Sequence, residues 1–131
     1  FAPGAPITLD LVTSPVQRFE GVTAFRSFLE PAMDRFAFVA FVIVAIHVDP
    51  SSTSERATSR LWFSEHRIDL DGGATQTYGL YRDELALAGA GAGAGVGAGS
   101  TRFGEWRFTR REYRTLARLP EGVVFPIPST D

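Results

Sequence analysis

Hydrophobic and polar residues alternate along several stretches of this chain, and a repeat of two residues is the pattern of a strand with one covered face. The alternation predicts strands over residues 6–12, 56–68, 78–87 and 102–119. Turn-forming residues occupy 49–55 and 69–75, with Asp-Gly-Gly near the tip of the second turn. The predicted strands therefore follow one another largely through hairpin-like turns.

Two further segments depart from simple alternation. Residues 21–36 carry apolar side chains at the spacing of one helix face, and Pro31 predicts that this helix stops or kinks near Glu30. Residues 38–48 are apolar at both parities and rich in Val, Ile and Phe, which predicts a strand buried on both faces. The order of a strand, a helix and then further strands indicates an antiparallel α+β domain.

The parity of each strand predicts which side chains share a face. One expected face carries Tyr81, Asp83, Leu85 and Leu87, and the next strand alternates through Trp106, Phe108 and Arg110. On 56–68, one face carries Ala57, Leu61, Phe63 and Glu65, and the other carries Thr58, Arg60, Trp62 and His66. A face with Tyr, Asp and Arg beside Trp and Phe is either a solvent-exposed face of the sheet or the wall of a pocket.

Composition narrows the chemistry that the chain can carry. Its 131 residues predict one domain, and the net charge of −2 is too small to attract nucleic acid or an anionic membrane. Cysteine is absent and every basic residue is Arg, which excludes thiolate chemistry and lysine Schiff bases. With two histidines and no phosphate-binding glycine loop, we expect neither a metal nor a cofactor.

Two other segments bear on location and order. The longest apolar run, residues 36–46, reaches about half of the roughly 20 residues that a membrane-spanning helix needs. No signal-peptide pattern is visible, so we expect a cytoplasmic protein. The Gly/Ala tract at 89–100 is expected to be a flexible loop, and a silk-like strand that stacks between molecules is the alternative.

Four motifs in this order resemble the SnoaL-like branch of the nuclear transport factor 2 superfamily. They are GVTAFRSFLE at 21–30, ATSRLWFSEHR at 57–67, GLYRDEL at 79–85 and WRFTRR at 106–111. The likeness extends from Ile7 to Leu119. It implies a cone, in which a curved antiparallel sheet wraps around helices and leaves a pocket between them.

The resemblance also implies a homodimer formed through the outer face of the sheet, which would supply the second cover for 38–48. The chain departs from the family pattern in two places. Relatives normally begin with helices that close the cone, and these are expected to be missing here. The Gly/Ala tract lies where relatives have a short turn.

Asp83 and Tyr81 are the first candidates for proton transfer. Their side chains stand on one strand face about 7 Å apart. A buried carboxylate beside a phenol can act as general base and oxyanion donor next to a carbonyl group. The alternative is that Asp83 pairs with an arginine such as Arg110 in a structural ion pair.

Glu65 and His47 are the supporting candidates. Glu65 follows apolar side chains on its face and lies either at a pocket rim or in solvent. His47 shares its parity with Phe41, and a structural role is the alternative for it. The walls of the pocket are expected to come from Phe25, Leu29, Phe41, Phe63, Trp106 and Arg110.

The residues and the resemblance together predict a cofactor-free isomerase, cyclase, dehydratase or hydrolase that acts on an apolar, oxygenated small molecule. The alternative is a non-catalytic, dimeric ligand-binding or structural protein of the same fold. The enzyme hypothesis expects Asp83 or Glu65 in a cavity without an arginine partner. The alternative expects both carboxylates to be paired or exposed.

Overall fold

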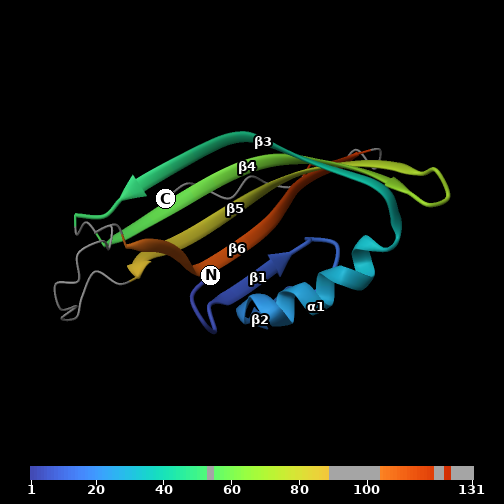
Figure 1. The fold of residues 1–131 in the computed structure, drawn as a ribbon. Helices are drawn as coiled ribbons and strands as arrows, with labels where there is room; N and C mark the ends of the chain where they lie inside the picture. The colour runs from blue at the N-terminus through green and yellow to red at the C-terminus, as the bar shows by residue number, and fades with distance from the viewer. Residues whose placement is uncertain (53–54, 89–103, 120–122, 125–131) are drawn as a thin grey trace, which may run out of the picture.

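One helix and one curved sheet make up the described part of the chain (Figure 1). The computed structural model describes residues 1–52, 55–88, 104–119 and 123–124. The elements are β1 (Pro6–Asp10), β2 (Gln17–Glu20), α1 (Gly21–Met33), β3 (Phe36–Pro50), β4 (Arg56–Asp69), β5 (Ala74–Ala88), β6 (Glu105–Leu119) and β7 (Val123–Val124). The Gly/Ala tract at 89–100 lies outside the described residues.

The strands form a single sheet in the order β2-β1-β6-β5-β4-β3, with β7 paired to β6. Neighbouring strands are antiparallel except β1 and β6, which are parallel. The antiparallel α+β layout expected from the sequence is confirmed, and the sheet is not closed. Among the described residues, no helix is long and apolar enough to cross a membrane.

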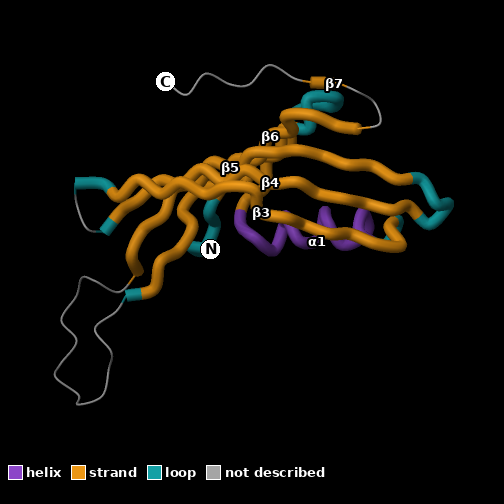
Figure 2. Tube along the Cα trace, turned by 90° about the horizontal axis from the view of Figure 1, so that it is seen from above, coloured by secondary structure: helices purple, strands orange, loops and turns teal. Residues whose placement is uncertain are grey.

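Helix α1 lies alongside only part of the long strands (Figures 1 and 2). Phe19 of β2 contacts the helix through Phe25 and Phe28, with ring centroids 5.4 and 5.0 Å apart. Pro31 does not stop the helix near Glu30, because the helix continues to Met33. The face of the sheet on which α1 lies is called the inner face below, and the opposite one the outer face.

The strand registers shift at four places, and two of these irregularities change which candidate side chains share a face. Thr109 of β6 has no partner on β5, because Glu84 pairs with Arg110 and Leu85 with Phe108. Val44 of β3 likewise has no partner on β4, because Ile43 pairs with Phe63 and Ala45 with Trp62. One extra residue reverses the alternation of a strand beyond it. Residues on either side of each bulge therefore do not keep the parity that the sequence predicts.

Strand β3 is the edge of the sheet and is largely exposed. Its apolar side chains include Val44, which is 62% exposed, and Ile46, which is 60% exposed. The prediction of a strand buried on both faces is therefore wrong for the single chain. The physical reason is position: β3 pairs only with β4 in the described structure, and no described element covers its faces.

Candidate functional site

A row of aromatic rings crosses the inner face of the sheet. Phe41, Phe63, Tyr81 and Tyr113 come from four successive strands, β3 to β6, with centroids 4.4, 5.1 and 5.3 Å apart along the row. Phe63 is 1% exposed. Gly79 on β5 leaves the space that its ring fills. The row forms a rigid apolar floor on which polar groups can be positioned.

Asp83 and Arg111 form an ion pair beside this row. Asp83 comes from β5, and its carboxylate accepts hydrogen bonds from Nε and Nη2 of Arg111 at 2.7 and 2.8 Å. Ser59 donates a third, longer bond to it at 3.3 Å. The Asp83 side chain is 1% exposed and that of Arg111 is 20% exposed. Two parallel bonds of this kind fix both the distance and the orientation of the two groups.

Aromatic rings hold the guanidinium group of Arg111 from several sides. Its carbon lies 4.4 Å from the Tyr81 centroid, 4.3 Å from that of Phe108 and 5.6 Å from that of Phe1. Cation–π contacts of this kind are attractive and restrict movement of the charged group. The charge of Arg111 is therefore fixed in place by both its carboxylate partner and its ring neighbours.

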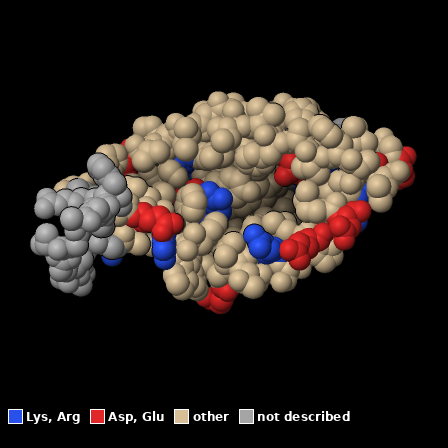
Figure 3. All heavy atoms as spheres, in the orientation of Figure 1, with Lys and Arg blue, Asp and Glu red and all other residues tan. Residues whose placement is uncertain are grey.

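An apolar cavity of about 400 Å³ opens beside the ion pair. Its lining is Ile46, Val48, Pro50, Arg56, Ala57, Ser59, Leu61, Asp83, Leu85, Trp106, Phe108 and Arg111. A second hollow of about 420 Å³ faces the helix and is lined in part by Phe25, Leu29 and Arg111. Figure 3 shows the surface hollowed between sheet and helix, with basic side chains at the margin. Arg111 therefore borders both spaces.

Tyr81 keeps its proton on this face. Burial raises the pKa of its phenol to about 12, against a weaker lowering influence from Arg111. Burial also raises the pKa of Tyr113, whose hydroxyl bonds to Thr115 at 3.0 Å. Both phenols are therefore hydrogen-bond donors at neutral pH rather than bases.

Glu65 also lies on the inner face, at the end of the aromatic row away from Asp83. Its negative charge contributes to the raised pKa of Tyr81 and of Tyr113. Its Oε1 lies 3.1 Å from Nε of Arg67, although that N–H is not directed at a hydrogen-bond partner. The Glu65 side chain is 29% exposed. This carboxylate is therefore less firmly held than that of Asp83.

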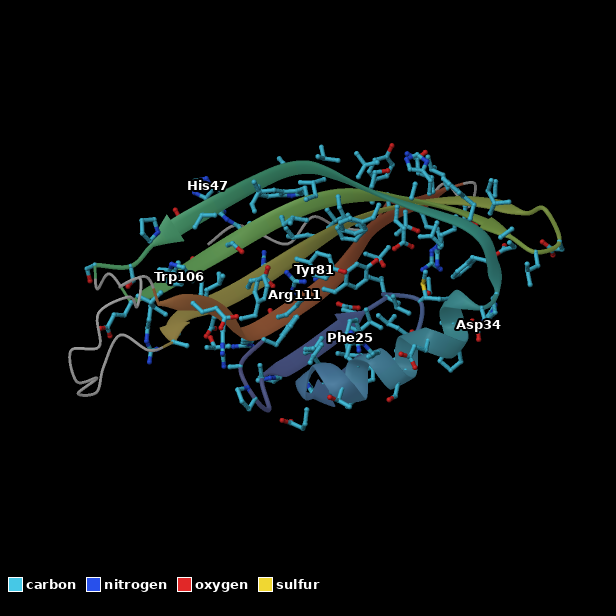
Figure 4. All side chains as sticks on the ribbon, viewed as in Figure 1. Phe25, Asp34, His47, Tyr81, Trp106 and Arg111 are labelled. Carbon is cyan, nitrogen blue, oxygen red and sulfur yellow. The ribbon has the colours of Figure 1, made fainter. Side chains whose placement is uncertain are left out.

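The structure brings together most of the residues that the sequence singled out. The inner face of the sheet carries Asp83, Tyr81, Glu65, Phe41, Phe63 and Trp106. Phe25 and Leu29 reach the same region from α1. Figure 4 shows Tyr81 and Arg111 in the space between sheet and helix.

Two candidates lie instead on the outer face. The bulge at Val44 lies between Phe41 and His47, so these two side chains point to opposite faces of the sheet. The predicted shared face is therefore wrong. His47 pairs with Asp49 at 2.8 Å and its side chain is 53% exposed. The bulge at Thr109 places Arg110 on the outer face as well, where it contacts Glu84 and Glu112. Neither residue borders the apolar cavity.

Arg111 is the residue that reasoning from the sequence missed. An arginine partner for Asp83 was the stated alternative, and Arg110 was the example given for it. The partner is the next residue, because Thr109 adds one position to β6. No local sequence signal marks this bulge. Among the described residues, no group of His, Asp and Glu side chains has the spacing of a metal site.

No family model and no curated protein matches the sequence. Several solved structures match the fold. A scytalone dehydratase candidate from Novosphingobium aromaticivorans is 19% identical, with a TM-score of 0.68 over 100% of this chain and 77% of the other. Hexachlorocyclohexane dehydrochlorinase LinA-type3 from Novosphingobium barchaimii is 11% identical, with a TM-score of 0.67 over 96% and 75%. A third structure, of LinA, is 13% identical with a TM-score of 0.67 over the same shares.

These similarities agree with the architecture built up from the residues. The fold match extends over 96–100% of this chain, so its arrangement of sheet and helix recurs in proteins of low sequence identity. Since identity stays below one fifth, the comparisons concern the fold. The chain shares the fold of these solved structures, and its curved antiparallel sheet beside a helix is the architecture that its motifs led us to expect.

Proposed function

We propose that this protein binds a small, largely apolar molecule that carries an oxygen atom, in the cavity beside Asp83 and Arg111. The observation that carries the proposal is a buried, doubly hydrogen-bonded ion pair on the wall of an otherwise apolar cavity of about 400 Å³. A few fixed polar groups among apolar walls are the usual composition of a ligand pocket.

Arg111 is the anchor in this proposal. A guanidinium group has five N–H donors, and Asp83 takes two of them. Others can donate to an oxygen atom of the ligand, while Leu61, Leu85 and Trp106 cover its apolar part. Asp83 then acts as the positioning residue that keeps Arg111 in place.

The test compares two adjacent arginines on opposite faces. Binding of 2-acetylnaphthalene is followed by calorimetry in the wild type, Arg111→Met and Arg110→Met. We expect Arg111→Met to weaken binding about tenfold or more, since it removes a charged donor. Arg110→Met should leave binding unchanged, because Arg110 lies on the outer face. Equal loss in both variants, or no binding by the wild type, would contradict the proposal.

Arg111→Met leaves the Asp83 carboxylate buried without its partner, and this destabilises a protein by roughly 3 to 5 kcal/mol. The double variant Asp83→Asn/Arg111→Met removes both charges and avoids that cost. Circular dichroism establishes that each variant is folded. The folded double variant is expected to show the same loss of binding as Arg111→Met.

A second candidate function is proton transfer, without a cofactor, on a molecule that lies over the aromatic row. It rests on Glu65, whose charge is felt by the neutral phenol of Tyr81. Glu65 lies 3.1 Å from Arg67 and Asp83 is paired with Arg111, so both carboxylates have the arginine partners that the non-catalytic alternative expected. Glu65 does not line the apolar cavity beside Arg111. It would take a proton from the carbon beside a carbonyl group of a molecule held over the aromatic row, and Tyr81 would stabilise the enolate oxygen. Isomerases, cyclases and dehydratases share this step. The two kinds of enzyme named among the fold neighbours, a dehydratase and a dehydrochlorinase, carry out eliminations by name.

In this second candidate function, Glu65 replaces Asp83 as the first candidate for the catalytic base. Asp83 was the first candidate base, but two hydrogen bonds from Arg111 occupy its oxygens. Exchange of the α-protons of 2-tetralone in heavy water, measured by NMR, tests the proposal without knowledge of the natural substrate. We expect the wild type to exceed the buffer rate and Glu65→Gln to return to it. Exchange at the buffer rate in the wild type would leave a binding protein only.

We also propose that two copies of the chain associate. The support is the apolar surface of β3, where Val42 is about half exposed and Val44 is 62% exposed. The resemblance implied an interface on the outer face of the sheet. On β5 and β6 that face carries Glu84, Arg110 and other charged side chains. The exposed apolar side chains of β3 are therefore the part that we expect to be covered.

A further inference from the structure

We infer that the cavity selects uncharged molecules over anions of the same shape, which rests on the proposed binding function. The observation is that the charge of Arg111 is already neutralised inside the cavity wall. Asp83 lies at 2.7 and 2.8 Å from two nitrogens of that group, with its side chain 1% exposed. The ion pair therefore offers a strong hydrogen-bond donor and has no net charge of its own.

Arg111 cannot leave Asp83 to bind an anion elsewhere. Its departure would leave a buried carboxylate with only the 3.3 Å bond from Ser59, and an unpaired buried charge is strongly unfavourable. The rings of Tyr81 and Phe108, each within 4.4 Å of the guanidinium carbon, also hold the group in position. A ligand must therefore bind Arg111 in its present position, next to Asp83.

An anionic ligand at this position would share the guanidinium with Asp83. Two carboxylates would then lie within a few ångströms of each other beside one cation, and like charges repel strongly where water is scarce. Arg56 is the other charged side chain of the lining. It is exposed, so water and salt screen its attraction for an anion.

A neutral acceptor meets none of this repulsion. The oxygen of a ketone, ester or ether can accept an N–H of Arg111 while Asp83 keeps its two bonds. The rest of the cavity offers Leu61, Leu85 and Trp106, which favour an alicyclic or aromatic skeleton. The chemical class that fits is a neutral, mostly hydrocarbon molecule with one exposed oxygen acceptor.

Calorimetry with three naphthalenes of matched shape tests this class. The probes are 2-acetylnaphthalene, 2-naphthoate and 2-ethylnaphthalene, which are a neutral acceptor, an anion and a molecule without an acceptor. We expect the ketone to bind the wild type about tenfold or more tightly than the anion. This factor corresponds to about 1.4 kcal/mol of repulsion between the anion and the Asp83 carboxylate. The ethyl compound should also bind more weakly than the ketone, because it leaves the donor unused.

The variant Asp83→Asn removes one charge and keeps the size of the side chain. It should shift the preference toward 2-naphthoate by about tenfold or more, whereas Arg110→Gln on the outer face should leave the preference unchanged. If Asp83→Asn does not fold, methyl 2-naphthoate and 2-naphthoate on the wild type decide the matter. A wild type that binds the anion as tightly as the ester or ketone would overturn the inference. Failure of every probe to bind would instead overturn the binding function itself.

Discussion

Tyr81 is a member of the aromatic row and also contacts the guanidinium group of Arg111, and this buried position determines its charge. Burial is the largest influence on its phenol and raises the pKa from 10.0 to about 12. The unfolded chain exposes the phenol, which then ionises near its ordinary value. The folded and unfolded states therefore bind different numbers of protons above about pH 10.

The difference predicts how stability depends on pH. Below about pH 10 the phenol is neutral in both states, and its contribution to stability is fully present. Between about pH 10 and 12 the unfolded state loses the proton first, so stability falls as pH rises, by up to roughly 3 kcal/mol. Urea unfolding measured at a series of alkaline pH values should show this decline.

Tyr81→Phe provides the control, because it removes the titrating group and keeps the ring. The variant should lose stability less steeply than the wild type between about pH 10 and 12. Some dependence will remain, since burial also raises the pKa of Tyr113. Parallel curves for the two proteins would show that Tyr81 ionises alike in the folded and unfolded states.

At the residue scale, sequence reasoning succeeded where a strand is regular and failed beyond a bulge. Tyr81 and Asp83 share a face of β5 as predicted, because β5 runs without an inserted residue between them. His47 and Arg110 were placed by parity, and each lies beyond an unpaired residue of its own strand. A bulge is fixed by contacts with the neighbouring strand, so the sequence of one strand does not reveal it.

At the scale of elements, the packing of β4 against β5 depends on a missing side chain. A Cβ atom on Gly79 would lie 2.4 Å from Cζ of Phe63 and 3.0 Å from Cε2 of Tyr113. Phe63 is 1% exposed and stacks on both Phe41 and Tyr81, which hold its ring in place. Gly79 therefore allows the aromatic row to continue from β4 to β6 without interruption.

Gly79→Ala should destabilise the protein by roughly 1 to 3 kcal/mol, the usual cost of overpacking a core. Gly73→Ala is the matched control in the turn between β4 and β5, where the new Cβ would approach side-chain oxygens of Asp69 and Asp71 less closely, at 3.2 and 3.3 Å. Chemical denaturation of both variants measures the difference. The double variant Gly79→Ala/Phe63→Leu should recover part of the loss, and no loss in Gly79→Ala would contradict this account of the packing.

Sequence patterns located the long elements well because their periodicity extends over many residues. The predicted strand 56–68 corresponds to β4 at Arg56–Asp69, and the predicted helix begins where α1 begins. Strand β2 was not predicted, since four residues after a proline carry too little periodicity. The helix end was placed too early because Pro31 lies in the last turn, where α1 ends within two residues.

At the scale of the whole molecule, the place of a strand in the sheet follows from long-range pairing that no local pattern records. Apolar residues at both parities predicted a strand buried on both faces for 38–48, yet β3 lies at one edge of the sheet and is largely exposed. A long apolar edge strand offers unpaired backbone groups and invites pairing with another chain. Residues 36–46 contain no charged side chain that would prevent it.

The exposed edge predicts that the protein self-associates through β3. Light scattering after size-exclusion chromatography should give twice the chain mass of 14.3 kDa at micromolar concentrations. Val44→Lys places a charge at a side chain that is 62% exposed, and a lysine on an edge strand opposes pairing. This variant should be a monomer. Leu70→Lys is the control, because Leu70 is 72% exposed in the turn after β4 and not on β3. A monomeric wild type would show that β3 remains uncovered, and a dimeric Val44→Lys would place the interface on another surface.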